Sequence, residues 1–263
     1  MDIIKAHATK NLCYISKKKM VPGGIVLHST GANNPNLKRY VDCPEELGVN
    51  RYGNHWNNSK PGGCLVCVHA FIGYDKNKNI RIAEILPLDI CCWGVGGGKN
   101  GSYNFNPPHI QIEICEDDLK NEEYYRKCFS LAAEYCADLC EKFGLTAEQI
   151  VSHKEAYERG YGSNHGDPEH WMKNYGETMD DFRNQVDDIL KSKAKTELPY
   201  LVRVTTDSLI IRKGSGNNTA KVGLITDRGV YTIVEERTGK GASLWGKLKS
   251  GAGWISLDYT DKY

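Results

Sequence analysis

The residues best suited to chemistry lie close together, between positions 152 and 171. His165 and Asp167 stand two apart, and Pro168 favours an extended backbone at Asp167. Side chains two apart in an extended backbone point to the same side, so both face one site. Together with His153 they offer two imidazoles and a carboxylate, a ligand set of catalytic zinc, which keeps a fourth position for water. Asp167 before Pro168 also fits the start of a helix, so both interpretations stay open at this point.

Short apolar strands are expected to position these side chains. Residues 21–31 form an apolar run that ends in polar residues, which predicts a buried strand with His28 at its carboxyl end. Open α/β sheets build their sites at that end. A brief strand at 150–151 delivers His153 in the same way. His28 is therefore a candidate site residue, although a core histidine bonded to the backbone would give the same pattern.

A further strand carries a carboxylate. Residues 109–118 alternate apolar and polar side chains, with Gln111 and Glu113 on the polar face. Glutamate is depleted in strands. Glu113 is therefore either part of a solvated outer face or a general base aimed into a cleft.

The remaining pattern predicts two domains. In the first, we expect strands at 64–74 and 80–86 that form a hairpin, and helices over 119–143 and 179–193, the first of them capped by Asp117 or Asp118. From residue 200 onward, about six short strands alternate with glycine turns, which is typical of a small β-barrel. We therefore place a catalytic domain at 1–192, a linker at 193–199 and an all-β domain at 200–263.

Charge and cysteine content differ between the two domains. Residues 200–263 hold ten Lys or Arg against six Asp or Glu, a net charge of +4, whereas residues 1–199 carry −3. The basic domain suggests an anionic partner. All ten cysteines lie within residues 13–140. We interpret them as reduced core thiols, with a structural zinc site at Cys64, Cys67, Cys91 and Cys92 as the alternative.

The first residues show no basic segment followed by an apolar core, and no apolar run is long enough to span a membrane. We expect a protein made in the cytoplasm without a signal peptide. We expect neither membrane insertion nor a nucleic-acid partner.

Four motifs in order resemble the zinc-dependent N-acetylmuramoyl-L-alanine amidases of the amidase-2 type, which share a fold with bacteriophage T7 lysozyme and the peptidoglycan recognition proteins. The motifs are Ile-Val-Leu-His28-Ser-Thr, Ile-Gln-Ile-Glu113-Ile, Ser-His153-Lys-Glu and His165-Gly-Asp167-Pro. The resemblance covers residues 20 to 175. It implies an α/β fold with a central mixed β-sheet flanked by helices.

The resemblance also implies roles. His28, His153 and Asp167 would bind Zn²⁺ with water as the fourth ligand, Glu113 would be the general base, and His165 would stabilise the oxyanion. The other histidines are interpreted as structural or surface residues; His69 and His109 lie nearest the expected cleft, and with Trp93 they are the candidates for substrate contacts. Relatives often carry His after this Trp, where this chain has Gly94, and we expect altered substrate contacts there.

Residues 200–263 resemble a bacterial SH3 domain through Leu209–Gly216, Leu244–Leu248 and Gly253–Ser256. An amidase joined to such a domain is a common layout of prophage endolysins and autolysins, which cut the bond between N-acetylmuramic acid and L-alanine in bacterial peptidoglycan. Without a visible signal peptide, we expect an endolysin that acts after holin-type release, with an autolysin as the alternative. The SH3-like domain would bind the wall, including its anionic polymers. The alternative is a non-catalytic peptidoglycan-binding protein. Such proteins lack the third ligand, whereas this chain has Asp167.

Overall fold

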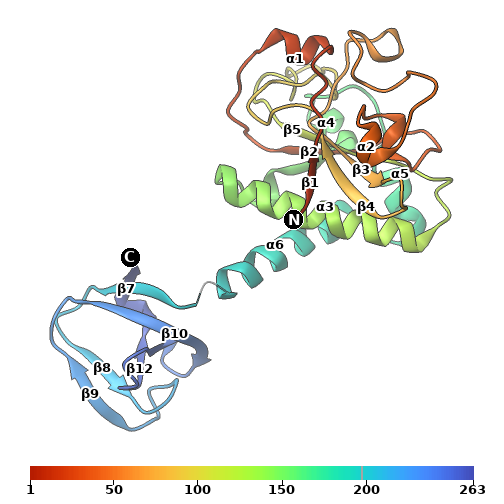
Figure 1. Cartoon of the computed structure of the whole chain (residues 1–263). Helices are drawn as coiled ribbons and strands as arrows, with labels where there is room; N and C mark the ends of the chain where they lie inside the picture. Colours follow the sequence, from red (N-terminus) through yellow and green to blue (C-terminus); the bar gives the residue numbers. More distant parts are fainter. Residues whose placement is uncertain (197) are drawn as a thin grey trace. The chain divides into compact units, whose positions relative to one another are not determined.

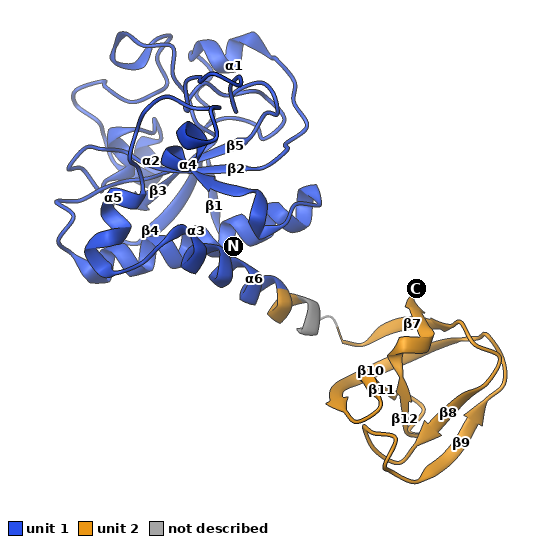
Figure 2. Ribbon diagram, turned by 180° about the vertical axis from the view of Figure 1, so that it is seen from behind, with its two compact units in different colours: residues 1–190 blue, residues 191–263 orange. Residues whose placement is uncertain are grey.

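In the computed structural model, which describes residues 1–196 and 198–263, the chain forms two compact units (Figure 2). Unit 1 spans Met1–Leu190 and unit 2 spans Lys191–Tyr263. Of the linker expected at 193–199, residues up to Thr196 belong to a helix, and residue 197 lies outside the described residues. Within the described ranges, no helix has both the length and the apolar character needed to cross a membrane.

A six-stranded mixed sheet forms the centre of unit 1 (Figure 1). Its strand order is β1-β4-β3-β5-β2-β6, and all neighbours are parallel except the antiparallel hairpin β3–β4. The strands are β1 Ile3–Lys5, β2 Ile25–Ser29, β3 Ala70–Tyr74, β4 Ile80–Glu84, β5 Ile110–Ile114 and β6 Ile150–Ser152. Strand β2, between β5 and β6, is buried along its whole length, as expected for a parallel strand covered on both faces. The expected mixed α/β sheet with flanking helices is confirmed.

Helices and loops cover the two faces of this sheet. The helices of the chain are α1 Leu12–Ser16, α2 Pro44–Leu47, α3 Glu122–Phe143, α4 His153–Glu158, α5 Glu169–Met172 and α6 Met179–Thr196. Apolar side chains at helical spacing on α3, such as Cys128, Ala132 and Tyr135, share one core with the sheet and with Phe182 and Val186 of α6. The opposite core includes Leu37, Leu47 and Phe71, from the chain that follows β2, from α2 and from β3.

Two expected element boundaries were wrong. The strand expected at 64–74 begins only at Ala70; in the register of β3 on β5, residues 65–66 would face Pro107 and Pro108, which have no N–H to donate. Helix α3 begins at Glu122 with Asn121 as its cap, rather than near Asp117 or Asp118, and the Asn121 side chain accepts the Tyr124 N–H.

Unit 2 is an antiparallel sheet with the strand order β13-β7-β10-β11-β12-β8-β9. Its strands are β7 Tyr200–Val204, β8 Leu209–Arg212, β9 Lys221–Ile225, β10 Val230–Gly239, β11 Ala242–Leu248, β12 Trp254–Ser256 and β13 Thr260–Lys262. Six of these match the expected strands to within a few residues, and β13 was not expected. Trp245 and Trp254 are buried. The all-antiparallel sheet is compatible with an SH3-like domain.

Candidate metal centre and active site

His28, His153 and Asp167 converge at one point. His28 Nδ1 lies 3.0 Å from His153 Nδ1 and 3.1 Å from Asp167 Oδ2, and His153 Nδ1 lies 3.4 Å from Asp167 Oδ1. Ligands on bonds of about 2.0–2.1 Å at tetrahedral corners lie about 3.3–3.4 Å apart. In the part of the chain that the structure describes, these three residues are the one cluster of His, Cys, Asp or Glu close enough to share a metal. The donor set and its spacing therefore fit zinc.

The sheet and the start of α4 bring the three ligands together. His28 is the fourth residue of β2, and His153 follows directly after the neighbouring parallel strand β6. Ser152 and Glu155 form a capping box that holds the first turn of α4. The N–H of His153 also donates to the backbone oxygen of Asp167, at 3.1 Å. Strand register and helix capping thus fix all three positions.

The electrostatics of the cluster favour metal-binding protonation states. Burial lowers the pKa of His153, which keeps its imidazole neutral as a ligand must be. Burial alone would raise the pKa of Asp167, but the interactions of its carboxylate with the His153 and His28 imidazoles outweigh it and hold that pKa well below its usual range. Asp167 is therefore a carboxylate at neutral pH. Its side chain does not cap α5, which begins at Glu169.

Glu113 lies directly opposite His28 in the β2–β5 register. Burial raises the pKa of Glu113 well above its usual range, and the charges of Asp167 and Glu116 add to this effect. Its Oε2 is buried and has no hydrogen-bond partner among the described residues. A carboxyl group with a raised pKa is suited to take up and release a proton near neutral pH. Glu113 thus belongs to the site rather than to a solvated face.

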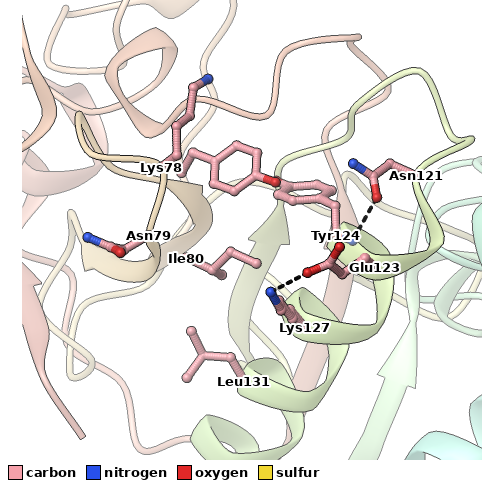
Figure 3. Close-up of a pocket in the computed structure, with 9 residues that line it drawn as sticks. Lys78, Asn79, Ile80, Asn121, Glu123, Tyr124, Lys127 and Leu131 are labelled. Carbon is pink, nitrogen blue, oxygen red and sulfur yellow. Dashed lines mark hydrogen bonds and ion pairs between the residues drawn. The ribbon is translucent and has the colours of Figure 1, made fainter.

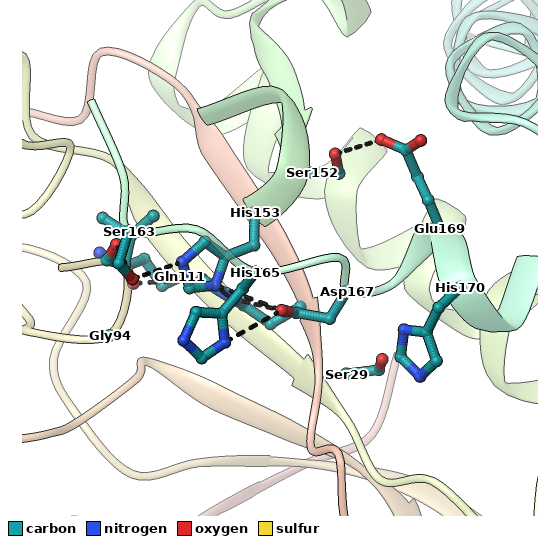
Figure 4. Close-up of polar contacts among 12 residues, drawn as sticks. Ser29, Gly94, Gln111, Ser152, His153, Ser163, His165, Asp167, Glu169 and His170 are labelled. Atoms are coloured by element: carbon teal, nitrogen blue, oxygen red, sulfur yellow. Dashed lines mark hydrogen bonds and ion pairs between the residues drawn. The ribbon is translucent and has the colours of Figure 1, made fainter. Parts of the chain in front are cut away.

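A cavity of about 520 Å³ connects these groups with solvent, and its walls include His28, Glu113, His153, His165 and Asp167. Figure 4 shows the rings of His153 and His165 beside the Asp167 carboxylate. His165 Nδ1 lies 3.7 Å from Asp167 Oδ1, and the His165 side chain is 61% exposed. The five residues expected to bind the metal and act in catalysis therefore share one cavity.

The three residues expected to contact substrate do not line this cavity. His69 is fully buried, and both its ring nitrogens are used, by the oxygen of Ile90 and the N–H of Gln111. His109 stacks on Tyr103 and donates to a backbone oxygen. Burial lowers the pKa of each histidine to about 4. Trp93 packs against the core around Phe71. The contacts of these residues are with the protein itself.

Other polar residues at the site were not identified from the sequence. Gln111 Oε1 lies 3.2 Å from His28 Nε2, and Ser163 Oγ lies 3.1 Å from His153 Nε2. Gln111 could have been predicted from its position on the same strand face as Glu113. Nothing in the sequence around Ser163 indicates its contact with His153.

A buried carboxylate lies in the wall beside them. Glu116 is held by the Ser29 hydroxyl at 2.6 Å and by His170 at 3.0 Å. The hydrogen bond to Glu116, together with its charge, raises the pKa of His170, which lines the cavity.

A second cavity, of about 440 Å³, lies between the β3–β4 turn and the first turns of α3 (Figure 3). Lys127 and Glu123 pair with each other on its wall. None of its lining residues is a histidine or a cysteine. This second cavity therefore offers no metal-binding set like that around His28.

A His-His-Asp cluster that could hold a metal thus lies beside a buried glutamate at the carboxyl ends of parallel strands. The chain belongs to the N-acetylmuramoyl-L-alanine amidase family Amidase_2, whose model matches residues 18–170. That match includes all five residues of the candidate centre.

Individual relatives agree with this assignment. The chain is 32% identical over 124 residues to a probable N-acetylmuramoyl-L-alanine amidase of Bacillus licheniformis, covering 45% of this chain and 32% of the relative. It is 24% identical over 236 residues to a bifunctional autolysin of Staphylococcus aureus strain MSSA476, covering 83% of this chain and 16% of the autolysin. The chain thus spans between about a sixth and a third of the length of these curated relatives.

Among solved structures, the fold is similar to that of the Staphylococcus aureus hydrolase AmiA in complex with its ligand. The TM-score is 0.54 at 20% sequence identity, over 74% of this chain and 85% of AmiA. At this identity the likeness concerns the fold.

Proposed function

We propose that the protein is a peptidoglycan hydrolase that cleaves the amide between the lactyl group of N-acetylmuramic acid and the L-alanine of the stem peptide. The observation that carries the proposal is the convergence of His28, His153 and Asp167 in one cavity with Glu113, in a chain of this family.

The three ligands would hold Zn²⁺, which when bound supplies a water of pKa about 7 and polarises the scissile carbonyl. Glu113 takes the proton of the attacking water and passes it to the leaving amine of L-alanine. His165, at the exposed side of the cluster, donates an N–H to the developing oxyanion. His28, His153 and Asp167 orient the reacting groups through their fixed positions.

Mass spectrometry of digested muropeptides tests the bond. We expect new free amino groups on L-alanine and no new reducing ends. Cleavage should stop with a chelator and return with added zinc. New reducing ends would instead show that a glycosidic bond is cut, and the proposal would be wrong.

A second candidate is a peptidoglycan-binding protein without activity, since a wall-binding cleft needs no general base. The retained Asp167 and the buried carboxyl of Glu113 favour the enzyme. Wall binding without any released amino group would decide for the binding protein.

For unit 2 we propose an SH3-like domain that binds the cell wall. Its antiparallel sheet and its net charge of +4 support binding to anionic wall polymers. A pulldown on purified walls compares the full chain with residues 1–192. Equal binding of both would assign the targeting to the amidase domain.

The route to the wall is part of the proposal: the protein is made in the cytoplasm and reaches peptidoglycan after holin-type release, as in a prophage endolysin. Cells that express the protein should lyse when a holin is co-expressed. Lysis without a holin would point to an exported autolysin.

A further inference from the structure

The peptide turn at Gly94 and Val95 lies beside both candidate metal-binding histidines. Its two N–H groups donate to Asn104 Oδ1, at 3.1 and 3.2 Å. Its Val95 oxygen accepts the Ser163 hydroxyl at 3.2 Å. We propose that this turn positions His28 through Asn104 and Gln111, and His153 through Ser163. The inference rests on the proposed metal centre.

The direction of the first chain of hydrogen bonds follows from the backbone. A backbone N–H can only donate, so the Asn104 atom that faces the turn must be its oxygen. Gln111 then has to present its NH₂ to that oxygen, at 2.8 Å. Its own oxygen is thereby turned to His28 Nε2, at 3.2 Å. His28 therefore carries a proton on Nε2, and its Nδ1 is the atom left for a metal.

The second chain is shorter and gives the same result. A backbone oxygen can only accept, so Ser163 donates its hydroxyl proton to Val95. The Ser163 oxygen is then the acceptor for His153 Nε2, at 3.1 Å. His153 also carries its proton on Nε2 and leaves Nδ1 for a metal. Figure 4 shows Gly94, Gln111 and Ser163 together on the side of His153 away from His170.

Both chains thus direct the two Nδ1 lone pairs at each other, 3.0 Å apart, beside the Asp167 carboxylate. Two neutral rings repel each other in that arrangement, whereas a shared cation stabilises it. Hydrogen bonds to the second nitrogen orient a metal-binding histidine and raise its basicity. Gln111, Asn104 and Ser163 are therefore positioning residues for the metal ligands.

Glycine is required at position 94 for the first chain. A Cβ there would lie 2.5 Å from Gln111 Oε1 and 3.0 Å from the Cys67 oxygen. A side chain at this position would displace the Gln111 amide from His28.

Zinc affinity, measured by competition with a chelator, tests the inference on the full chain. Gln111→Leu and Ser163→Ala should each weaken binding by about 10- to 100-fold, the usual cost of losing such a partner. Ser16→Ala is the matched control, because its hydroxyl also donates to a backbone oxygen, that of Cys13, and contacts neither Asn104, Gln111 nor a histidine. Thermal melts check that each variant folds. If Gln111→Leu does not fold, Ser163→Ala alone decides.

Nitrogen NMR of the zinc-loaded protein provides a residue-specific readout. Gln111→Leu should shift the Nε2–H signal of His28 and leave that of His153 in place, and Ser163→Ala should do the reverse. Unchanged zinc affinity in both variants, or signals of both histidines moving together in each, would overturn the inference while the amidase proposal stands. A wild-type chain that binds no zinc would overturn the metal centre itself, and the inference with it.

Discussion

The imidazole rings of His153 and His165 stack face to face, with 4.6 Å between their centroids and 4° between their planes. One of these rings is a candidate metal ligand and the other is largely exposed at the cavity. The stacking holds His165 at the site without a hydrogen bond to its outer nitrogen. His165 thus offers two features that substitution can separate: a ring that stacks on His153 and an N–H that can donate to the oxyanion.

The variant His165→Phe keeps a flat ring and removes the N–H. We expect zinc binding to persist and kcat to fall about 100-fold, the cost of losing one oxyanion donor. His7→Phe, outside the cavity, is the control. Kinetics together with metal analysis measure both effects. A kcat equal to that of wild type would mean that stacking is the whole role of His165.

The variant Glu113→Gln keeps the shape of the side chain but removes the proton acceptor. We expect kcat to fall by about 10²- to 10⁴-fold with zinc still bound, because proton transfer to and from Glu113 is lost. Glu122→Gln, on the exposed side of α3, should leave kcat unchanged. Equal activity of Glu113→Gln and wild type would remove Glu113 from the mechanism.

Acid stability tests the structural role of His69. Burial lowers its pKa from 6.5 to about 4, so the folded state takes up this proton less readily than the unfolded state. Above pH 6.5 the contribution of His69 to the free energy of unfolding is fully present. As the pH falls from 6.5 towards 4, this free energy should decrease by an amount of the order of 3 kcal/mol. In His69→Gln, the free energy of unfolding should fall less over this range, and KM should not change. A raised KM with an unchanged acid profile would instead support substrate binding.

The motifs at His28, Glu113 and His153 identified the candidate centre because each residue follows or lies within a short strand, and parallel strands end at one edge of a sheet. Asp167 was identified by its spacing from His165 and by Pro168. For His69, which lies directly before β3 and inside the strand expected at 64–74, the sequence left a structural role and a substrate contact both open. The sequence around such a histidine does not show whether its ring faces the cavity or the core. Only the position of Ile90 and the Gln111 N–H around the His69 ring distinguishes the two cases.

Hydrogen bonds between distant segments were likewise beyond sequence reasoning. Ser163 reaches His153 and Val95 only because two glycine-containing loops pack together, with Gly96 against Ser163 and Gly98 against Gly160. The start of β3 was set too early for a similar reason. Its partner strand β5 is preceded by Pro107 and Pro108. Which residues of this segment would face 64–69 cannot be predicted from residues 64–69 alone.

The variant Gly94→Ala tests the close approach at the turn. Its Cβ would meet Gln111 Oε1 at 2.5 Å, so we expect zinc affinity to fall by about 10-fold. Gly97→Ala is the control in the same loop, because a Cβ there meets nothing closer than 3.5 Å. Chelator competition on both variants measures the difference. Equal losses would indicate a general effect on the loop.

Cys64 is the exposed thiol among ten free cysteines, of which Cys43 is half-buried and the others are buried. Thiol reagents need an accessible thiolate, and burial raises the pKa of core thiols such as Cys136. A maleimide dye should therefore attach first at Cys64, as mass spectrometry of Cys64→Ser would verify. Val66, two residues away, lines the cavity. The native chain thus offers a single labelling position from which fluorescence can follow the arrival of a wall fragment.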